Sequence, residues 1–377
     1  MTAASAVKGI REVDPSGPIA LFTEETNPPY DRPPLTKGLW KGKSVEEIWR
    51  KVDGGVDMYI GRSIVQLDPH NKTVTDAIGE TYLYEQLLLA TGGTPRKLSF
   101  GQESILYYRT FNDYLMLQDR VQKGGKFAVV GGGFIGSELA AALCLNHQPV
   151  IMIFPGHDIG ERVFPPDLAR YVTDYYREKG IEIRHGDELL AIEKYHERLL
   201  LKLKSGNDLL VEHIVAGLGI RPNVELAEEA ELATEDGIVV DEYLQTNAPD
   251  VYAAGDVAAF YASALEKRTR VEHEDNANTM GRIAGRNMTG QREAYHHLPM
   301  FYSDLFDLGY EAVGELNASL ETYEDWQEPN KKGVIYYLSN GRVRGVLLWN
   351  VWDKVPQARE LIRAPGPFTA NDLKGRL

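Results

Sequence analysis

The sequence has 377 residues, enough for two or three domains with full cores, and its apolar and charged fractions are those of an ordinary globular protein. A net charge of −14 argues against a general nucleic-acid footprint and gives no attraction to an anionic membrane surface. The one cysteine, Cys144, excludes a disulfide framework and a Cys-x-x-Cys redox pair within one chain. Without a good membrane span or signal peptide, a cytoplasmic location is the default expectation.

The first part of the chain predicts a helix followed by several strands. Small and apolar residues at helical spacing predict a helix over 2–13, and Gly-Pro at 17–18 leads into a strand over 19–22. The next expected elements are a loop over 27–37, a helical stretch near 45–52 and strands over 63–68, 73–75 and 82–90.

The middle of the chain repeats a strand-helix-strand rhythm. Its expected elements are helices over 111–122, 134–145 and 166–179 and strands over 126–130, 149–153 and 181–184. We interpret this region as a second doubly wound unit inserted into the first, with Gly217 to Asn223 as the returning linker. Near 299 the pattern changes to the alternation of apolar and polar residues that is typical of antiparallel strands, with a hairpin signal at Ser339-Asn-Gly341. The predicted domains are therefore 1–98 with 220–298, then 99–219, then 299–377.

A glycine turn marks a candidate nucleotide site. Lys126 to Leu145 read KFAVVGGGFIGSELAAALCL, a strand, a G-x-G-x-x-G turn and a small-residue helix. Gly131 allows a tight turn, Gly133 lets backbone N–H groups approach a pyrophosphate, and Gly136 allows close helix packing. The alternative is an ordinary strand-turn-helix, but the flanking strand and helix patterns favour a dinucleotide site with the phosphates at the helix N-terminus.

A second candidate is Asp256, which follows an expected strand over 251–254 in TNAPDVYAAGDVA. An open parallel sheet binds ligands at the carboxyl ends of its strands, so this carboxylate could accept hydrogen bonds from a ligand hydroxyl. From the residues alone, a Gly-Asp turn without a ligand is the more common interpretation.

Together with ATGGTPR (90–96) and YDRPPLTK (30–37), these motifs resemble the FAD-dependent pyridine nucleotide oxidoreductases over nearly the whole chain. MFYSDLFDLGYEAVGEL (300–316) and GVLLWNVWDKVPQARELI (345–362) resemble the interface domain of apoptosis-inducing factor and of ferredoxin-reductase-type flavoproteins. The disulfide-reductase branch is disfavoured because it needs paired cysteines. The resemblance implies an α/β fold with two doubly wound Rossmann-like nucleotide-binding domains, one inserted in the other, and a C-terminal α+β interface domain. No metal is implied.

The resemblance also implies the FAD contacts. Glu24 is expected at the FAD ribose, Arg32 at the phosphates and Lys37 beside flavin N5, where Glu138 supplies the counter-charge that a poorly hydrated ammonium needs. The remaining expected contacts are Thr91 and Arg109 lining the cofactor, Asp256 at the ribityl chain, and His273 with Glu274 opening a helix whose N-terminus faces the flavin pyrimidine. Without the resemblance, Glu24, Arg32 and Arg109 are interpreted as solvated surface charges and His273 as a satisfied loop histidine.

For the nicotinamide nucleotide, the resemblance assigns the pyrophosphate turn to Gly131, Gly133, Phe134, Ile135 and Gly136, and places Gly217, Glu311 and Asn350 near the nicotinamide or its ribose. The family's ribose carboxylate is replaced by Gly156. His157 and Arg162 follow it and could bind a 2′-phosphate, so NADPH stays an alternative to a slightly favoured NADH. Tyr302 stands where relatives carry tryptophan.

The start of the chain departs from the family pattern. Such proteins open with a strand and a glycine fingerprint for FAD, and Ala3 takes the third glycine position of that fingerprint. We expect the sequence to be incomplete there; the alternative is a natural truncation with weakened flavin binding.

The expected reaction is hydride transfer from NAD(P)H to flavin N5, followed by electron delivery to a ferredoxin- or rubredoxin-like carrier, a quinone or oxygen. The negative net charge of the chain mildly disfavours an acidic ferredoxin as the partner. The alternatives are an NADH-responsive redox sensor or interaction protein with slow turnover, like apoptosis-inducing factor, and an apoprotein that binds only the nicotinamide nucleotide. A homodimer is left open.

Overall fold

The computed structural model describes residues 1–52 and 54–377, and these form two compact units. Unit 1 comprises Met1–Arg32, Ser44–Thr94 and Arg221–Met300, and unit 2 comprises Pro33–Lys43, Pro95–Ile220 and Phe301–Leu377. The central insertion expected from the sequence is present, because residues 95–220 belong to a different unit from the segments on either side. The predicted three-domain boundaries stay a prediction, since the C-terminal residues here share unit 2 with the insertion.

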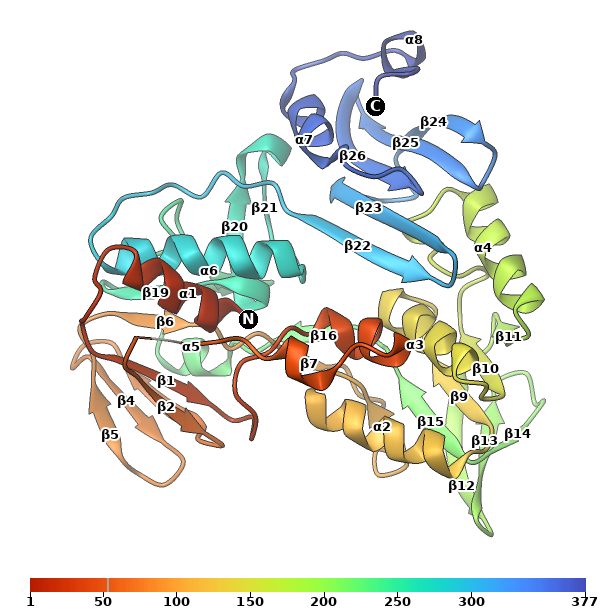
Figure 1. Ribbon diagram of the computed structural model, residues 1–377, viewed down its shortest axis with the longest axis horizontal. Helices are drawn as coiled ribbons and strands as arrows, with labels where there is room; N and C mark the ends of the chain where they lie inside the picture. The colour runs from red at the N-terminus through yellow and green to blue at the C-terminus, as the bar shows by residue number, and fades with distance from the viewer. Residues whose placement is uncertain (53) are drawn as a thin grey trace. The chain divides into compact units, whose positions relative to one another are not determined.

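Unit 1 combines helices with several small sheets (Figure 1). Its helices are α1 (Thr2–Arg11), α5 (Glu225–Glu229) and α6 (Glu274–Met288), with 3₁₀ turns η3 (Val45–Ile48), η4 (Gly255–Val257) and η5 (Ser263–Leu265). Its strands are β1 (Ile19–Thr23), β2 (Val56–Ile60), β3 (Ile64–Asp68), β4 (Thr73–Asp76), β5 (Thr81–Leu83), β6 (Leu87–Leu89), β17 (Thr234–Glu235), β18 (Gly237–Val239), β19 (Val251–Ala253), β20 (Ala258–Ala262) and β21 (Lys267–Thr269). Strands β7 (Gly93–Pro95) and β16 (Ile220–Pro222) pair where the chain changes unit.

The strands of unit 1 pair in both directions. β1 pairs with β2 and β6 pairs with β19, both in parallel. β3, β4 and β5 form an antiparallel sheet, and the order of the other sheet is β17-β18-β20-β21. The parallel pairs carry the turns that follow β1 and β19, where the candidate FAD residues lie.

Helices α1 and α6 lie side by side in unit 1 (Figure 1). A Cβ added at Gly9 would come within 2.0 Å of the Arg282 carbonyl oxygen, and one added at Gly285 within 2.1 Å of the Ala6 carbonyl oxygen. Only glycine allows two backbones to approach this closely. These small residues therefore fix the place of the α1 N-terminus along α6.

Unit 2 contains the parallel sheet of the insertion, in the order β11-β10-β9-β15-β8. Its elements are η1 (Pro33–Leu35), η2 (Gly38–Lys41), β8 (Ile105–Tyr107), α2 (Phe111–Lys123), β9 (Phe127–Val130), α3 (Phe134–Leu145), β10 (Val150–Phe154), α4 (Pro166–Glu178), β11 (Glu182–His185) and β15 (His213–Ala216). β9 and β10 are fully buried and apolar, as strands covered on both faces require. An antiparallel sheet of β12 (Leu189–Tyr195), β13 (Arg198–Leu203) and β14 (Leu209–Val211) packs its apolar side chains into the same core.

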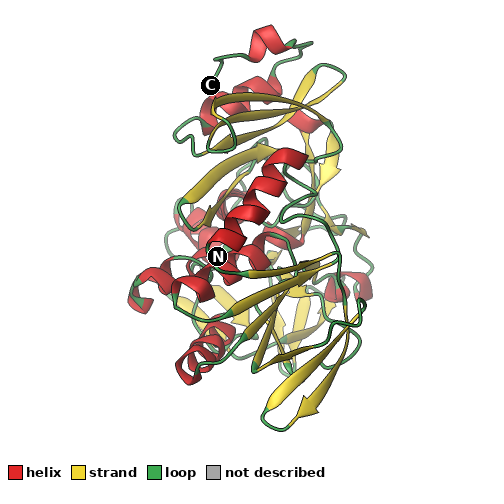
Figure 2. Ribbon diagram, turned by 90° about the vertical axis from the view of Figure 1, so that its right-hand side faces the viewer, coloured by secondary structure: helices red, strands yellow, loops and turns green. Residues whose placement is uncertain are grey.

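The C-terminal part of unit 2 is a five-stranded sheet in the order β22-β23-β26-β25-β24. Its elements are β22 (Met300–Leu305), β23 (Leu308–Gly314), β24 (Glu321–Glu328), β25 (Lys332–Ser339), β26 (Arg342–Trp349), α7 (Val355–Arg363) and α8 (Ala370–Leu373). The expected hairpin is present, because β25 and β26 pair antiparallel around Asn340-Gly341. Figure 2 shows these long strands beside the helices that end the chain.

Three expectations for local structure are wrong. The stretch near 45–52 is a short 3₁₀ turn, because Trp49 leaves the helix to form a bridge with Tyr30. The strand expected over 82–90 is two strands, β5 and β6, that pair with different partners. Strand β2 was not expected. None of the described helices is long and apolar enough to cross a membrane.

Candidate functional site

The glycine turn between β9 and α3 leaves space at its tip and is tightly packed on both sides. Gly131 has φ +118°, and a Cβ at Gly136 would lie 2.1 Å from the Gly131 carbonyl oxygen. A Cβ at Gly133 would meet no atom within 4 Å. Gly133 is also the residue before α3 and supplies no side-chain cap. The open helix N-terminus fits a phosphate group, which takes hydrogen bonds from N–H groups that have no partner within the helix.

The other residues predicted at this turn lie next to it. A Cβ at Gly131 would come within 2.4 Å of the Gly217 carbonyl oxygen, so Gly217 contacts the turn directly. Phe134 and Ile135 are 37% and 38% exposed although both are large and apolar. Large apolar side chains are unfavourably exposed to water, so these two residues beside a helix N-terminus are suited to contact the rings of a nucleotide.

Unit 2 contains a buried ion pair, Lys37–Glu138. Lys37 Nζ is 2.7 Å from Glu138 Oε1, and their side chains are only 12% and 4% exposed. Thr36 donates a hydrogen bond of 2.5 Å to Glu138 Oε2, and Ser303 donates one of 2.6 Å to Oε1. The pairing expected from the resemblance is confirmed. The two hydroxyl donors were not predicted, because nothing in a lone serine or threonine indicates which carboxylate it will meet.

Three separate parts of the chain meet at this ion pair. Thr36 and Lys37 lie between η1 and η2, whose position is fixed by hydrogen bonds from Trp40 Nε1 and the Tyr108 hydroxyl to the Leu35 carbonyl oxygen. Glu138 lies in the first half of α3, and Ser303 lies on β22. Burial, together with the charge of Glu138, raises the pKa of the neighbouring Tyr176 and Tyr310 well above the usual value for tyrosine.

Tyr302 lies on the exposed side of this cluster. Its ring centroid is 5.3 Å from Lys37 Nζ, and the residue is 38% exposed. A cation over an aromatic face gains a modest attraction, and tyrosine supplies a smaller face than the tryptophan expected in relatives. Tyr302 therefore limits the directions in which the Lys37 ammonium can point.

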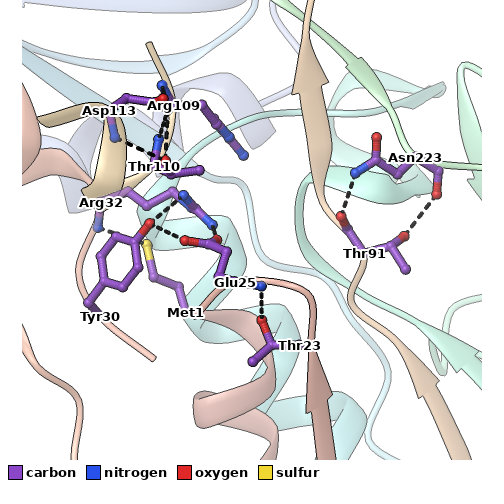
Figure 3. A network of polar contacts seen from close by, with 10 residues as sticks. All are labelled: Met1, Thr23, Glu25, Tyr30, Arg32, Thr91, Arg109, Thr110, Asp113 and Asn223. Carbon is purple, nitrogen blue, oxygen red and sulfur yellow. Dashed lines mark hydrogen bonds and ion pairs between the residues drawn. The ribbon is translucent and has the colours of Figure 1, made fainter. Parts of the chain in front are cut away.

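In unit 1, Arg32 forms an ion pair with Glu25 (Figure 3). The Tyr30 hydroxyl donates to Glu25 Oε2 at 2.6 Å and accepts from Arg32 Nη1 at 2.9 Å. Burial lowers the pKa of Arg32, but the charges of Tyr30, Glu25 and Asp256 outweigh it and the net shift is upward. The predicted residues Arg32 and Asp256 are thus close enough to interact. Glu24 is exposed, and no sequence pattern indicates the role of its neighbour Glu25.

Arg50 connects the start of α6 to the start of α1. It forms ion pairs with Asp31 and, at 3.6 Å, with Glu274, and it donates a hydrogen bond of 2.7 Å to Asn278 Oδ1. Arg50 Nη1 also donates to the Met1 carbonyl oxygen at 3.5 Å. The predicted residue Glu274 therefore belongs to a charged network around a second, unpredicted arginine.

Asp256 and His273 lie at two turns of unit 1. Asp256 follows β19 in the turn η4, where a Cβ at Gly255 would come within 2.2 Å of Thr2 Oγ1. The α1 N-terminus therefore lies against the Gly255-Asp256 turn. His273 caps α6, and burial lowers its pKa from 6.5 to about 4 although the charges of Asp256 and Asp275 oppose the shift. At neutral pH this imidazole is uncharged.

These residues fit FAD. The α1 N-terminus has no side-chain cap, and the charged groups of Arg32 and Arg50 lie close enough to act on the Met1 amine. Two cations are therefore available where a diphosphate would bind. Asp256 lies at the same end of α1, and its contact with a sugar or ribityl hydroxyl group stays a prediction. The residues that would hold the cofactor in unit 1 are Arg32, Asp256, His273 and Glu274.

Thr91 and Arg109 are placed by hydrogen bonds of their own. The Thr91 hydroxyl donates to the Asn223 carbonyl oxygen at 2.8 Å, and Asn223 Nδ2 donates to the Thr91 carbonyl oxygen at 2.8 Å (Figure 3). Arg109 precedes the helix cap of α2 and its backbone N–H donates to Asp113 Oδ2 at 3.0 Å. Arg109 belongs to unit 2 and Thr91 to unit 1, so their joint role at one cofactor stays a prediction.

Glu311 and Asn350 lie in the C-terminal sheet of unit 2. Burial and the charge of Asp353 raise the pKa of Glu311, which lies on β23. The Asn350 amide accepts a hydrogen bond from Gly309 N at 2.8 Å and donates one to the Lys331 carbonyl oxygen at 2.8 Å. The Asn350 side chain therefore connects β23 to the residue before β25, and its predicted contact with the nicotinamide stays a prediction.

The loop after β10 contains the predicted phosphate-binding residues His157 and Arg162, and both are exposed. The structure adds a carboxylate that the sequence did not indicate. Glu161 Oε2 accepts a hydrogen bond of 2.7 Å from the His157 backbone N–H, and a Cβ at Gly156 would come within 2.1 Å of Glu161 Oε1. Glu161 therefore folds back over the glycine that replaces the expected acid.

Residues 2–281 match the family described as pyridine nucleotide-disulphide oxidoreductase. The chain belongs to this family. Residues 284–331 and 323–364 match the C-terminal domain of mitochondrion-associated apoptosis-inducing factor. The expected α/β fold with two Rossmann-like nucleotide-binding domains and a C-terminal domain is thereby confirmed, and the members of this family use FAD and NAD(P)H. With a single cysteine, the chain has no redox disulfide of its own.

Individual relatives agree with this assignment. The chain is 34% identical to apoptosis-inducing factor 1, mitochondrial, of Dictyostelium discoideum, over 95% of this chain and 75% of the relative. It is 32% identical to monodehydroascorbate reductase 3 of Arabidopsis thaliana, over 88% of this chain and 83% of the relative. A ferredoxin reductase from Rhodopseudomonas palustris superimposes with a TM-score of 0.90 at 28% identity, covering 98% of this chain and 94% of that chain.

A putidaredoxin reductase, solved in covalent complex with putidaredoxin, superimposes with a TM-score of 0.91 at 26% identity, covering 98% of this chain and 92% of that chain. The expectation of an NAD(P)H-dependent FAD oxidoreductase is therefore confirmed at the level of family and cofactors. Across residues 1–52 and 54–377, no group of three or more His, Cys, Asp or Glu side chains is arranged to hold a metal ion.

Proposed function

We propose that this chain takes a hydride from NAD(P)H onto bound FAD and delivers the electrons to a small one-electron carrier protein of the ferredoxin or rubredoxin class. The observation that carries the proposal is the buried Lys37–Glu138 pair with its two hydroxyl donors. FAD, when bound, supplies a ring system that accepts a hydride and releases single electrons.

The polar cluster gives Lys37 a fixed position. Glu138 accepts hydrogen bonds from Thr36 and Ser303, so its carboxylate cannot rotate freely, and Lys37 is held against it at 2.7 Å. A preorganised cation stabilises negative charge that develops at a reacting nitrogen, and does so more strongly where water is excluded. Lys37 would thus favour the reduced cofactor.

Helix α3 connects the two halves of the reaction. It begins at the glycine turn, where the nucleotide pyrophosphate would bind, and carries Glu138 in its first half. Because a helix is rigid over so few residues, the phosphate position and the carboxylate position are fixed relative to one another. Hydride transfer depends mainly on such positioning, since the two rings must meet at near-contact distance.

The relatives support a one-electron acceptor. Two of the solved structures are reductases of ferredoxin and of putidaredoxin, and several curated relatives are reductases of monodehydroascorbate. A quinone and oxygen are the alternative acceptors. Because the chain carries a net charge of −14, the carrier protein that fits best is one without a strongly acidic face.

Anaerobic stopped-flow absorbance tests the proposal in two steps. NADH or NADPH should bleach the flavin band rapidly, and a ferredoxin- or rubredoxin-type protein should then restore the band faster than a quinone or air. Lys37→Ala should slow the bleaching while the protein stays yellow, and Asp256→Ala should yield protein with little flavin. Rapid bleaching followed by equal reoxidation with every acceptor would remove the carrier protein from the proposal.

The second candidate function is a redox-responsive interaction protein. The identity of 34% to an apoptosis-inducing factor and the matching C-terminal domain favour it. In that case NADH would reduce the flavin slowly, a long-wavelength charge-transfer band would persist, and the elution volume in size-exclusion chromatography would change with NADH. The same column run reports whether a homodimer forms.

The cytoplasmic location stays a prediction, since the names of relatives include mitochondrial and peroxisomal proteins.

A further inference from the structure

The end of β10 carries a carboxylate that comes from an unusual position in the sequence. In dinucleotide-binding folds, the acid that accepts the ribose 2′-hydroxyl follows the glycine turn by about 20 residues, and this chain has Gly156 there. A Cβ built at Gly156 would lie 2.1 Å from Oε1, 2.6 Å from Cδ and 3.0 Å from Oε2 of Glu161. The Glu161 carboxylate thus occupies the space in which the side chain of residue 156 would begin.

Backbone N–H groups hold this carboxylate in place. Glu161 Oε2 accepts hydrogen bonds from His157 N at 2.7 Å and from Asp158 N at 3.4 Å. Charge-assisted hydrogen bonds of this kind are stronger than neutral ones. They point the carboxylate back toward the strand end, although the residue itself lies on an exposed part of the loop.

The loop is attached to the elements around it. Gly160 N donates to the Gly132 carbonyl oxygen at 3.0 Å, which connects the loop to the glycine turn. Ile159 N donates to Thr173 Oγ1 of α4 at 2.8 Å, and Gly186 N donates to the Gly156 carbonyl oxygen at 2.8 Å. The position of the Glu161 carboxylate is therefore fixed relative to the turn that would bind the pyrophosphate.

We propose that Glu161 accepts the 2′-hydroxyl of the adenosine ribose and selects NADH over NADPH, in place of the acid missing at residue 156. The inference rests on the proposed use of a nicotinamide nucleotide. A 2′-phosphate in the same place would bring its negative charge against a carboxylate whose lone pairs already receive backbone N–H groups, so NADPH binds less well.

The loop also contains two basic residues, which would favour a 2′-phosphate. His157 and Arg162 are exposed and could attract a 2′-phosphate, whereas Glu161 repels one. The position favours Glu161, because its carboxylate lies over residue 156. Arg162 therefore serves as the variant that tests the competing assignment.

The test measures nucleotide binding directly, without turnover. Isothermal titration of the flavin-loaded protein with ADP-ribose and with its 2′-phosphorylated form gives the ratio of the two dissociation constants. In Glu161→Gln this ratio should move at least tenfold toward the phosphorylated ligand, because a charged acceptor is lost and a repulsion is removed. Steady-state reduction with NADH and NADPH should show the same change in the ratio of kcat/KM.

Three variants serve as controls. Asp158→Asn removes the other carboxylate of the loop and should leave the ratio within twofold of the parent. Arg162→Ala should still bind ADP-ribose more tightly than its 2′-phosphorylated form. In Glu161→Ala with Gly156→Glu, the carboxylate comes from the usual position and the NADH preference should return, whereas Gly156→Glu alone would displace Glu161.

An unchanged ratio in Glu161→Gln, in a protein that still binds ADP-ribose, would overturn the role of Glu161 and leave the proposed function intact. Equal or tighter binding of the 2′-phosphorylated ligand by the parent, lost in Arg162→Ala, would assign the site to NADPH and also overturn it. Failure of the parent to bind either ligand, or to be reduced by either coenzyme, would instead contradict the proposed function. Far-ultraviolet circular dichroism and the melting temperature confirm that each variant is folded.

Discussion

Arg32–Glu25 in unit 1 and Lys37–Glu138 in unit 2 are both ion pairs formed by cations expected at the cofactor, but they are built differently. Arg32 and Glu25 come from one loop, and their side chains are 31% and 18% exposed. Lys37 and Glu138 are 12% and 4% exposed, and a third part of the chain contributes Ser303. The first pair is local and partly hydrated, and the second depends on the whole fold of unit 2.

This difference predicts that the two ion pairs change the stability of the fold by different amounts when one partner is removed. A partly hydrated pair changes stability little when it is broken, because water replaces the lost partner. A buried pair does not allow this replacement, so removal of one partner leaves an uncompensated charge. The following predictions start with the largest expected effect.

Glu138→Ala should lower the free energy of unfolding by about 3–5 kcal/mol, because Lys37 stays buried without its counter-charge. Urea denaturation followed by circular dichroism measures the change. The double variant Lys37→Met with Glu138→Leu removes both charges and should recover most of the loss while flavin reduction stays slow. If the double variant were as unstable as Glu138→Ala, the loss would come from packing and not from the unpaired charge.

The second prediction concerns pH. Burial lowers the pKa of His273 to about 4 in the folded chain from 6.5, so between these values the unfolded chain binds a proton that the folded chain does not. The contribution of uncharged His273 to the free energy of unfolding is present above pH 6.5 and is lost as the pH falls toward 4. It amounts to about 3 kcal/mol. Urea unfolding at pH 7 and at pH 4.5 measures the loss.

His273→Gln provides the comparison, because glutamine is similarly polar and does not titrate in this range. The variant should lose less stability than the parent over the same interval. An equal loss in both proteins would assign the pH dependence to other groups and would mean that His273 is less buried than the structure shows.

The third prediction tests Ser303, one of the two hydroxyl donors of the buried cluster. Ser303→Ala should reduce the free energy of unfolding by about 2 kcal/mol, since a hydrogen bond to a charged group is lost. It should also slow flavin reduction by NADH, because the carboxylate that positions Lys37 loses one of its two hydroxyl hydrogen bonds. Ser303→Thr keeps the hydroxyl and should restore both quantities; a rate that stays low in the threonine variant would point to crowding by the side chain.

The sequence predicted the parts of this molecule that depend on short-range patterns. The glycine turn, the helix over 134–145 and the hairpin around Asn340 each follow from neighbouring residues, and the structure contains them. The Lys37–Glu138 pair required the family resemblance, since the partners are far apart in the chain.

What could not be predicted depends on contacts between distant segments or on one side chain folding back. Ser303 and Thr36 reach Glu138 only after β22, η1 and α3 have packed together. Glu161 occupies the space above Gly156 because the loop turns back on itself, which no period of hydrophobic residues indicates. Similarly, Glu24 and Glu25 are adjacent and identical in type, and only the fold shows which one pairs with Arg32.

The smallest expected effect comes from this adjacent pair of glutamates. Glu25→Gln should change the free energy of unfolding by less than about 1 kcal/mol, because its partner Arg32 can be hydrated. Glu24→Gln should not change stability measurably, since Glu24 is exposed, but it should weaken FAD binding if Glu24 contacts the ribose as the resemblance implies. Fluorescence titration of the apoprotein with FAD measures the affinity of each variant. Weaker FAD binding in Glu25→Gln but not in Glu24→Gln would transfer the ribose contact to Glu25, and would show that the local ion pair serves the cofactor and not the fold.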